Sequence, residues 1–226
     1  MDIRKFFRLS IQSMSITRNA ATARNGNAAE RRMCDNTDVR ERLAAYFGKQ
    51  IVSISLIPGR KKSDVSLVFD DSTTLRLQNK EGDGNNRGWS VDRRSLSKMP
   101  VDDAGRELLD NVCLKHTGDR PTAACPPTLI SDLLLGSDPE TAPTHFTHSI
   151  FHKETGELLH ISIASVSDVL TSLTSSMYPT LVPKRTCVHI SPLLYLQRKG
   201  GGSSDHAPND IQLKLKSFPA GVLRVL

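Results

Sequence analysis

The 226-residue sequence predicts an α/β protein of the α+β type, with a mixed central sheet flanked by helices and a disordered N-terminal arm. Two patterns predict the folded part. Apolar residues alternate with polar ones in several short segments, and they recur at helical spacing in several longer segments. A third observation predicts the arm, because residues 10–36 are rich in Ser, Asn, Ala and Arg and contain few large apolar side chains.

The first helix is expected directly after residue 36. Asn36, Thr37 and Asp38 are good N-cap residues, and Gly48 is typical of a helix end. Helical patterns at 102–116, 127–136 and 165–178 predict the remaining helices.

Strands are expected at 51–57 and in the two alternating segments on either side of a turn at residues 70–73. A turn centred near Asp71 would place Asp64 opposite Gln78, on the same face of the hairpin. The strand period of two adds Lys80 to that face, while the apolar residues take the other. Further strands are expected at 157–164, 187–199 and 211–216.

Convergence of Asp64, Gln78 and Lys80 would have a chemical use. A carboxylate and an amide carbonyl supply oxygen ligands for Mg²⁺ or Mn²⁺, which are hard cations. Such a metal polarises a phosphate and activates a water molecule. A lysine beside it can orient that water or stabilise negative charge on the phosphate. The alternative is an ordinary polar strand face.

The order of helix, strand, strand, strand over residues 38–116 resembles the PD-(D/E)xK nuclease superfamily, which includes many restriction endonucleases and DNA-repair nucleases. The resemblance implies a restriction-endonuclease-like core in which Asp64 opens the second strand and Gln78-x-Lys80 closes the third. Its implied catalytic residues are Asp64, Gln78, Lys80 and, as an auxiliary acid on the first helix, Glu41. Asp64 and Gln78 would be the metal ligands. Gln78 departs from the usual Asp or Glu and is a weaker ligand than a carboxylate.

Basic residues in two regions are candidates for DNA contacts, because lysine and arginine bind phosphates. One group follows the hairpin and the other lies near the C-terminal glycine-rich loop. The candidates are Arg87, Arg93, Arg94, Arg198, Lys199 and Lys214. The alternative is a solvated surface.

Charge and composition divide the chain. Residues 1–34 hold seven basic and two acidic residues, and so carry most of the net charge of +6. We expect residues 1–36 to form a flexible basic arm. Residues 37–226 would form a single nuclease-like domain, with its core at about 38–116 and its C-terminal strands and DNA-contact region at 145–226.

The first seven residues, MDIRKFF, place Ile3, Phe6 and Phe7 at the i, i+3, i+4 spacing of a one-turn helix. They resemble the PIP-box by which replication and repair proteins bind the sliding clamp, although the usual leading Gln is absent. The resemblance implies the clamp as a partner and, in a eukaryote, a nuclear location. The alternative is an apolar anchor that packs onto the protein's own body.

No apolar run approaches the ~20 residues of a membrane span. The N-terminus also lacks the apolar core of a secretory signal, so we expect an intracellular protein without a membrane partner. Several residues are of zinc-ligand type, namely Cys113, His116, Cys125, His145 and His148. Their spacing fits no standard zinc finger, so a structural Zn²⁺ is a minor alternative.

These patterns predict a metal-dependent DNA endonuclease that the arm tethers to the replication clamp. The alternative is a non-catalytic DNA-binding or clamp-binding adaptor on a decayed nuclease fold. A third reading is an α+β interaction domain with a coincidental hairpin.

Overall fold

The computed structural model describes residues 28–58, 62–81, 89–115, 118, 120–152, 154–199 and 209–226. The predicted clamp-binding residues Ile3, Phe6 and Phe7 lie outside the described residues, as does the predicted DNA contact Arg87.

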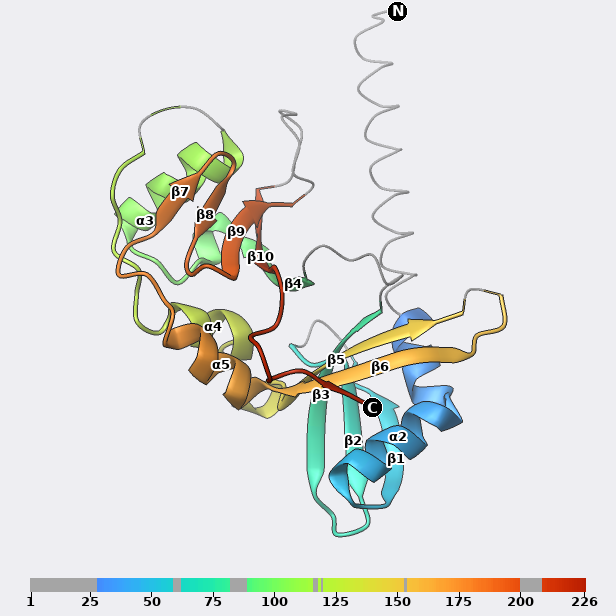
Figure 1. Ribbon diagram of the computed structural model, residues 1–226. Coiled ribbons are helices and arrows are strands. Elements are labelled where there is room, and N and C mark those ends of the chain that lie inside the picture. The colour runs from blue at the N-terminus through green and yellow to red at the C-terminus, as the bar shows by residue number, and fades with distance from the viewer. Residues whose placement is uncertain are drawn as a thin grey trace, which may run out of the picture.

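The larger of two sheets is mixed. Its strands, in spatial order, are β1 (Ile51–Leu56), β2 (Val65–Phe69), β3 (Thr74–Glu81), β5 (His145–Phe151), β6 (Leu158–Ser165) and β11 (Arg224–Val225) (Figure 1). Neighbouring strands are antiparallel except β3 and β5, which run parallel. The predicted α+β class with a mixed sheet is therefore confirmed.

Strands β2 and β3 form the predicted hairpin in the predicted register. Val65 lies opposite Leu77, and both side chains are fully buried. Extending this register by one pair places Asp64 opposite Gln78. The apolar face of the hairpin packs into the core, so its polar face is left for the site described below.

Helical residues cover the apolar face of this sheet. The helix α2 (Thr37–Phe47) begins as predicted, because Asn36 Oδ1 accepts a hydrogen bond from the Val39 backbone N–H at 3.0 Å. It ends at Gly48, whose φ of 64° is left-handed and suits glycine. Buried Val39 and Leu43 pack with the apolar residues of the sheet.

Residues 28–35 are also helical, although they fall in the predicted linker. Met33 is fully buried, and its Sδ lies 3.8 Å from Thr147 Oγ1 on β5. The exposed Arg32 pairs with Glu81 on β3, with 2.6 Å between Nη2 and Oε1. The predicted flexible arm therefore does not extend to residue 36, because this segment docks on the sheet.

The smaller sheet is antiparallel throughout. Its strands, in spatial order, are β4 (Trp89–Ser95), β10 (Asp210–Leu215), β9 (Leu194–Arg198), β8 (Cys187–His189) and β7 (Val182–Lys184). The sequence does not predict β4, because charged residues at 92–94 interrupt any alternation. Isolated strand patterns near the C-terminus do predict β8, β9 and β10.

Helices pack on one face of this smaller sheet and between the two sheets. They are α3 (Asp103–Leu109), the π-helical η2 (Asp110–Leu114), α4 (Leu129–Leu135) and α5 (Val166–Thr174), with the short 3₁₀ turns η1 (Leu96–Lys98) and η3 (Pro139–Thr141). In Figure 1, α3 lies behind β7 and β8. The apolar core here includes Phe146 and Ala164 of the larger sheet, so the sheets share packing.

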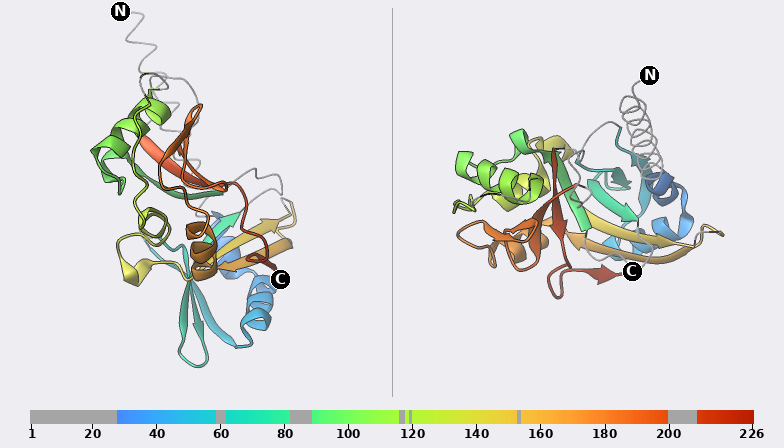
Figure 2. Two further views of the ribbon diagram at one scale, coloured as in Figure 1. Left: turned by 60° about the vertical axis from the view of Figure 1, so that its left-hand side comes forward. Right: turned by 90° about the horizontal axis from the view of Figure 1, so that it is seen from above.

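The two sheets lie beside each other at an angle (Figure 2). Trp89 at the start of β4 bridges them. Its ring centroid lies 4.7 Å from that of His148 on β5 and 4.5 Å from that of Phe218. No helix in the described part of the chain is both long and apolar enough to cross a membrane.

Candidate active site

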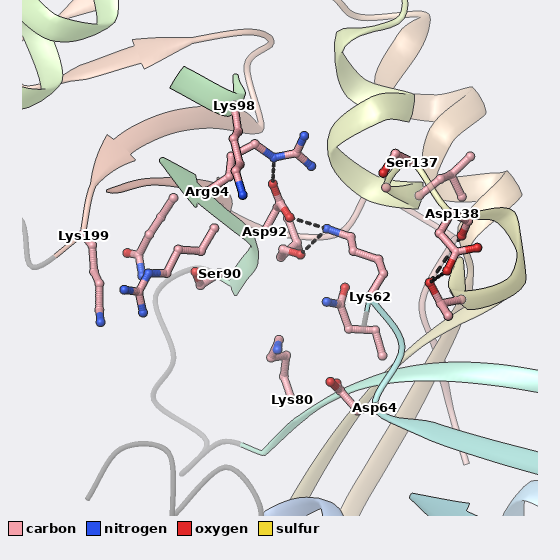
Figure 3. A pocket seen from close by; sticks show the side chains of 17 residues that line it. Lys62, Asp64, Lys80, Ser90, Asp92, Arg94, Lys98, Ser137, Asp138 and Lys199 are labelled. Atoms are coloured by element: carbon pink, nitrogen blue, oxygen red, sulfur yellow. Dashed lines mark hydrogen bonds and ion pairs between the residues drawn. The ribbon is translucent and has the colours of Figure 1, made fainter. Parts of the chain in front are cut away.

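A cavity of about 840 Å³ opens between the two sheets. Its walls come from the polar face of the β2–β3 hairpin, from β4 and β10, and from the chain that follows α4. Figure 3 shows Asp64 and Lys80 on one wall, with Ser90 and Lys199 on the wall opposite. Asp64, Gln78 and Lys80 all line this cavity, so the structure brings together the three hairpin residues that the sequence singles out.

Asp64 is held at the entry to β2 by two backbone interactions. Its N–H donates to the Leu77 carbonyl oxygen at 2.8 Å, and its Oδ2 accepts from the Asn79 N–H at 2.8 Å. Burial raises the pKa of the Asp64 carboxyl, against the opposing effects of Lys80 and of the Asn79 N–H. A cation beside a carboxyl in such surroundings stabilises its ionised form.

Gln78 lies next to Asp64 on β3 and is 7% exposed. Its Oε1 has no hydrogen-bond partner among the described residues. A buried carbonyl oxygen without a partner costs free energy unless a ligand supplies one. An oxygen-seeking divalent cation would satisfy it, so Asp64 and Gln78 fit such an ion.

Lys80 follows two residues after Gln78 and shares its face of β3. Figure 3 shows its amine pointing into the cavity, with Asp64 beside it on the same wall. On the neighbouring parallel strand, His148 is its register partner. Strand β3 therefore fixes the position of the Lys80 backbone, while the amine reaches the open space of the cavity.

A second acid, Glu30, lies near this group, although it does not line the cavity. Glu30 is half-buried on the 28–35 helix. Its pKa is raised, first by burial and then by the negative charge of Asp64, while Lys80 opposes this shift. These electrostatic effects place Glu30 within the field of both residues.

The structure does not bring Glu41 to this site. It is exposed on α2 and does not line the cavity. The helical acid near Asp64 is instead Glu30, eleven positions earlier in the chain. One sequence pattern indicates this helix: Ala29 and Met33 are spaced by four, and both are buried where the helix packs on the sheet.

A buried network of charges ties the two walls together. Lys62 Nζ lies 2.6 Å from Asp92 Oδ1 and donates to the carbonyl oxygen of Leu133 at 2.5 Å. Arg94 Nε donates to Asp92 Oδ2 at 2.7 Å, and Arg94 Nη2 to the Asp132 carbonyl oxygen at 3.1 Å. These bonds hold β4 and α4 against the segment that leads into Asp64. Arg94, a predicted DNA contact, is thus mainly engaged within the protein.

Other predicted DNA contacts lie on or near the opposite wall. Arg93 and Lys199 both line the cavity. Arg93 Nε donates to Asp210 Oδ2 at 2.7 Å, and 46% of the Arg93 side chain is exposed. Lys214 is half-buried on β10 and does not line the cavity.

Arg198 has a different position from the one predicted. It is 4% exposed, and its Nη1 donates to the carbonyl oxygen of Leu114 at 3.0 Å. Strand alternation explains this, because Arg198 shares the core-facing side of β9 with Leu194 and Leu196. Its guanidinium supports the end of η2 and is not presented to DNA.

The charge of the cavity favours an anionic ligand. Its lining contains six basic residues, Lys62, Lys80, Arg93, Arg94, Lys98 and Lys199, and three acids, Asp64, Asp92 and Asp138. A cleft lined mainly by one sign of charge concentrates ligands of the opposite sign.

The cysteine and histidine residues do not form a zinc centre in the part of the chain that the structure describes. No three of the described His, Cys, Asp and Glu side chains are grouped as metal ligands would be. Cys113 is buried under the smaller sheet, where its Sγ donates to the Leu196 carbonyl oxygen at 3.5 Å. His116 lies outside the described residues.

No protein-family model matches the chain, and no curated protein sequence is significantly similar to it. Among solved structures, the chain is similar to the restriction endonuclease MspI in complex with its cognate DNA. The TM-score is 0.46 and the sequence identity 13%, over 78% of this chain and 77% of that one. A likeness at this level carries no argument by itself, so the functional assignment depends on the residues of the cavity.

Proposed function

We propose that this protein is a metal-dependent endonuclease that hydrolyses phosphodiester bonds of DNA. The observation that carries the proposal is the meeting of the Asp64 carboxylate, the unpartnered Gln78 Oε1 and the Lys80 side chain in one cavity lined by basic residues. Their order along helix and strands resembles the PD-(D/E)xK superfamily, with Glu30 in the place of the helical acid.

Asp64 and Gln78 would hold a Mg²⁺ or Mn²⁺ ion, and Glu30 would support them as an auxiliary acid. When bound, such an ion polarises a phosphoryl oxygen and lowers the pKa of a water molecule. The negative charge of Glu30 would add to that of Asp64 and offset the weaker amide ligand. The raised pKa values of Asp64 and Glu30, which are both partly buried, support this, because a cation would relieve the desolvation of both acids.

Lys80 would act on the phosphate itself. Its side chain extends from a strand that pairs on both sides, so the base of the side chain has a fixed position at the cavity. A cation held beside the scissile phosphate stabilises the negative charge that grows there during hydrolysis.

Arg93, Lys98 and Lys199 would hold the DNA backbone on either side of the cut. All three line the cavity. Phosphate contacts of this kind position a duplex without reading its sequence.

The arm adds a proposal about location. Ile3, Phe6 and Phe7 would dock in the pocket of a sliding clamp, which would bring the nuclease to replicating DNA in a nucleus. The spacing of these three residues supports it.

A non-catalytic adaptor that binds DNA or the clamp is the second candidate. The specific observation in its favour is Gln78, because an amide stands where a carboxylate would bind metal more strongly.

Incubation of the purified protein with supercoiled plasmid and Mg²⁺ or Mn²⁺ tests the proposal. We expect the wild type to nick or linearise the plasmid, and Lys80→Ala to lose this activity. Lys115→Ala is the matched control, because Lys115 is 60% exposed in its side chain and pairs with Asp110 outside the cavity. Cleavage by Lys80→Ala at the wild-type rate would overturn the assignment. A wild type that binds DNA and cuts none would favour the adaptor.

A further inference from the structure

The smaller sheet has one face packed on its core and one face that turns away from it. Val188, Leu196 and Leu213 occupy the core side and are fully buried or nearly so. Their neighbours along each strand point to the opposite side, because side chains alternate along a strand. We call that opposite side the open face.

The strand register arranges the open face into two rows that cross all five strands. The first row contains Lys184, Cys187, Gln197, Gln212 and Arg93. The second row contains Val182, His189, Tyr195, Lys214 and Ser90. Neither row contains an acidic residue.

The chemistry of the open face suits an anionic partner with hydrogen-bonding groups. Cations stand at both edges of the first row, at Lys184 on β7 and Arg93 on β4. Gln197 and Gln212 lie side by side between them. The nearest described acid on this face, Asp210, already pairs with Arg93.

Aromatic and basic groups complete the second row. The rings of His189 and Tyr195 stack, with centroids 5.4 Å apart. Lys216 Nζ lies 6.0 Å from the Tyr195 ring centroid. Lys184 and Lys216 both lower the pKa of His189, after burial, so this end of the open face is electropositive.

The open face is continuous with the cavity. Ser90, Arg93 and Gln212 belong to the two rows and also line the cavity. A polymer whose phosphate lies beside Lys80 therefore has a path onto this face across β4 and β10. Figure 1 shows these strands side by side from β4 to β7, with α3 behind β7 and β8.

We infer that the open face is a second DNA-contact surface, which binds the duplex beside the cleaved bond; this inference rests on the proposed nuclease function. Five strands about 4.8 Å apart give a face roughly 19 Å across. That is wider than the major groove, at about 12 Å. Lysines and Arg93 at the edges would contact the two backbones, while the paired glutamines face the base edges, for which their amides are suited.

Binding measured without cleavage tests the surface. Fluorescence anisotropy of a labelled 30-base-pair duplex, in EDTA, would compare the wild type with the double variant Lys184→Glu/Lys214→Glu. We expect the dissociation constant to rise at least about tenfold. The slope of log K against log salt should also fall by roughly 1.8, because each lost phosphate contact removes about 0.9.

The matched control is Arg120→Glu/Arg224→Glu. It makes the same change in charge at two exposed residues that lie in neither row and do not line the cavity. Because its change in net charge equals that of the row variant, a loss confined to the row variant reports on the open face. Equal losses of affinity in both double variants would overturn the inference, since they would reflect net charge alone.

The same measurements separate this inference from the proposed function. If Lys80→Ala abolishes cleavage and the row variant binds DNA as the wild type does, the open face is not a DNA surface although the nuclease stands. If the row variant loses binding and the wild type cuts nothing with Mg²⁺ or Mn²⁺, the surface stands and the nuclease fails. Self-association in sedimentation experiments that only the row variant loses, with unchanged DNA affinity, would assign the face to a second copy of the chain and overturn the inference.

Discussion

Asp64 accepts a hydrogen bond from the backbone N–H of Asn79, with 2.8 Å between Oδ2 and N. This one bond joins the residue that opens β2 to the middle of the Gln78-Asn79-Lys80 segment on β3. One carboxylate oxygen is thereby fixed in position. Asn79 is itself held from its far side, because its Oδ1 accepts from Thr147 Oγ1 at 3.1 Å. The geometry of the candidate site is thus set by backbone and buried polar contacts.

The first prediction concerns Asp64→Asn. Asparagine keeps an oxygen that can accept the Asn79 hydrogen bond, so the fold should persist. The charge that binds metal is lost. Since outer-sphere partners of a metal already contribute 10- to 100-fold to affinity, removing a direct ligand should lower cleavage by at least about 100-fold. Plasmid cleavage and the melting temperature, measured on one preparation, would check both statements. Wild-type cleavage in this variant would remove Asp64 from the metal site.

The second prediction concerns Gln78→Glu. A carboxylate adds negative charge toward Mg²⁺ and should tighten its binding by roughly tenfold, with cleavage retained. Without metal, the added charge beside Asp64 and Glu30 should lower the melting temperature. Calorimetric titration with Mg²⁺ and melting curves with and without the ion would show the two effects. Gln78→Leu, which has no oxygen, is the control and should weaken metal binding. Loss of cleavage in a folded Gln78→Glu protein would mean that Gln78 has some function other than metal ligation.

The third prediction concerns pH. Asp64 and Glu30 have pKa values raised above those of ordinary carboxyls, chiefly by burial. Above pH ~4, where the unfolded chain releases these protons, the folded state still holds more of them. The free energy of unfolding of the metal-free protein should therefore fall as pH rises from this value through the raised folded pKa values. Urea unfolding at a series of pH values would measure the fall. Asp64→Asn/Glu30→Gln should flatten it, and an equally steep fall in that variant would show that other groups cause it.

The fourth prediction concerns the arm. Phe6→Ala/Phe7→Ala should remove most binding of a peptide of residues 1–12 to a purified sliding clamp, because buried aromatic anchors each contribute about 2 kcal/mol or more. Cleavage of free DNA by the full chain should be unchanged. Arg4→Ala/Arg8→Ala in the same peptide controls for charge. A wild-type peptide that produces no heat with the clamp would contradict the proposed tether.

The hairpin could be predicted from sequence because it depends on local rules. A period of two and a short polar turn fix the register, and the register fixes which residues face Asp64. The same holds for the capped helix α2, whose start and stop residues lie next to it in the chain. The hairpin alone carries Asp64, Gln78 and Lys80, three of the four residues of the candidate site.

The other parts of the fold and of the candidate site depend on contacts between segments that are distant in the sequence. No local sequence pattern predicts such contacts. Lys62 meets Asp92 only because β4 packs beside the segment that precedes β2. The charge of Arg198 and its position near a glycine-rich loop predict a DNA contact, but its place in the alternation of β9 buries it. Glu30 lies in a segment whose composition resembles a linker, and buried Ala29 and Met33 dock that segment on the sheet.

The last prediction uses this difference between two helical acids. Glu30→Ala and Glu41→Ala make the same chemical change on neighbouring helices. Glu30 lies in the field of Asp64 and Lys80, whereas Glu41 is exposed on α2. We expect Glu30→Ala to weaken Mg²⁺ binding and cleavage by about 10- to 100-fold, the range for groups that support a metal site. Glu41→Ala should match the wild type in both. Raising the Mg²⁺ concentration should partly restore cleavage in Glu30→Ala, because a weakened site still fills at higher ion concentration. The reverse pattern, with loss in Glu41→Ala and none in Glu30→Ala, would return the auxiliary acid to α2 and show that the 28–35 helix only packs on the sheet.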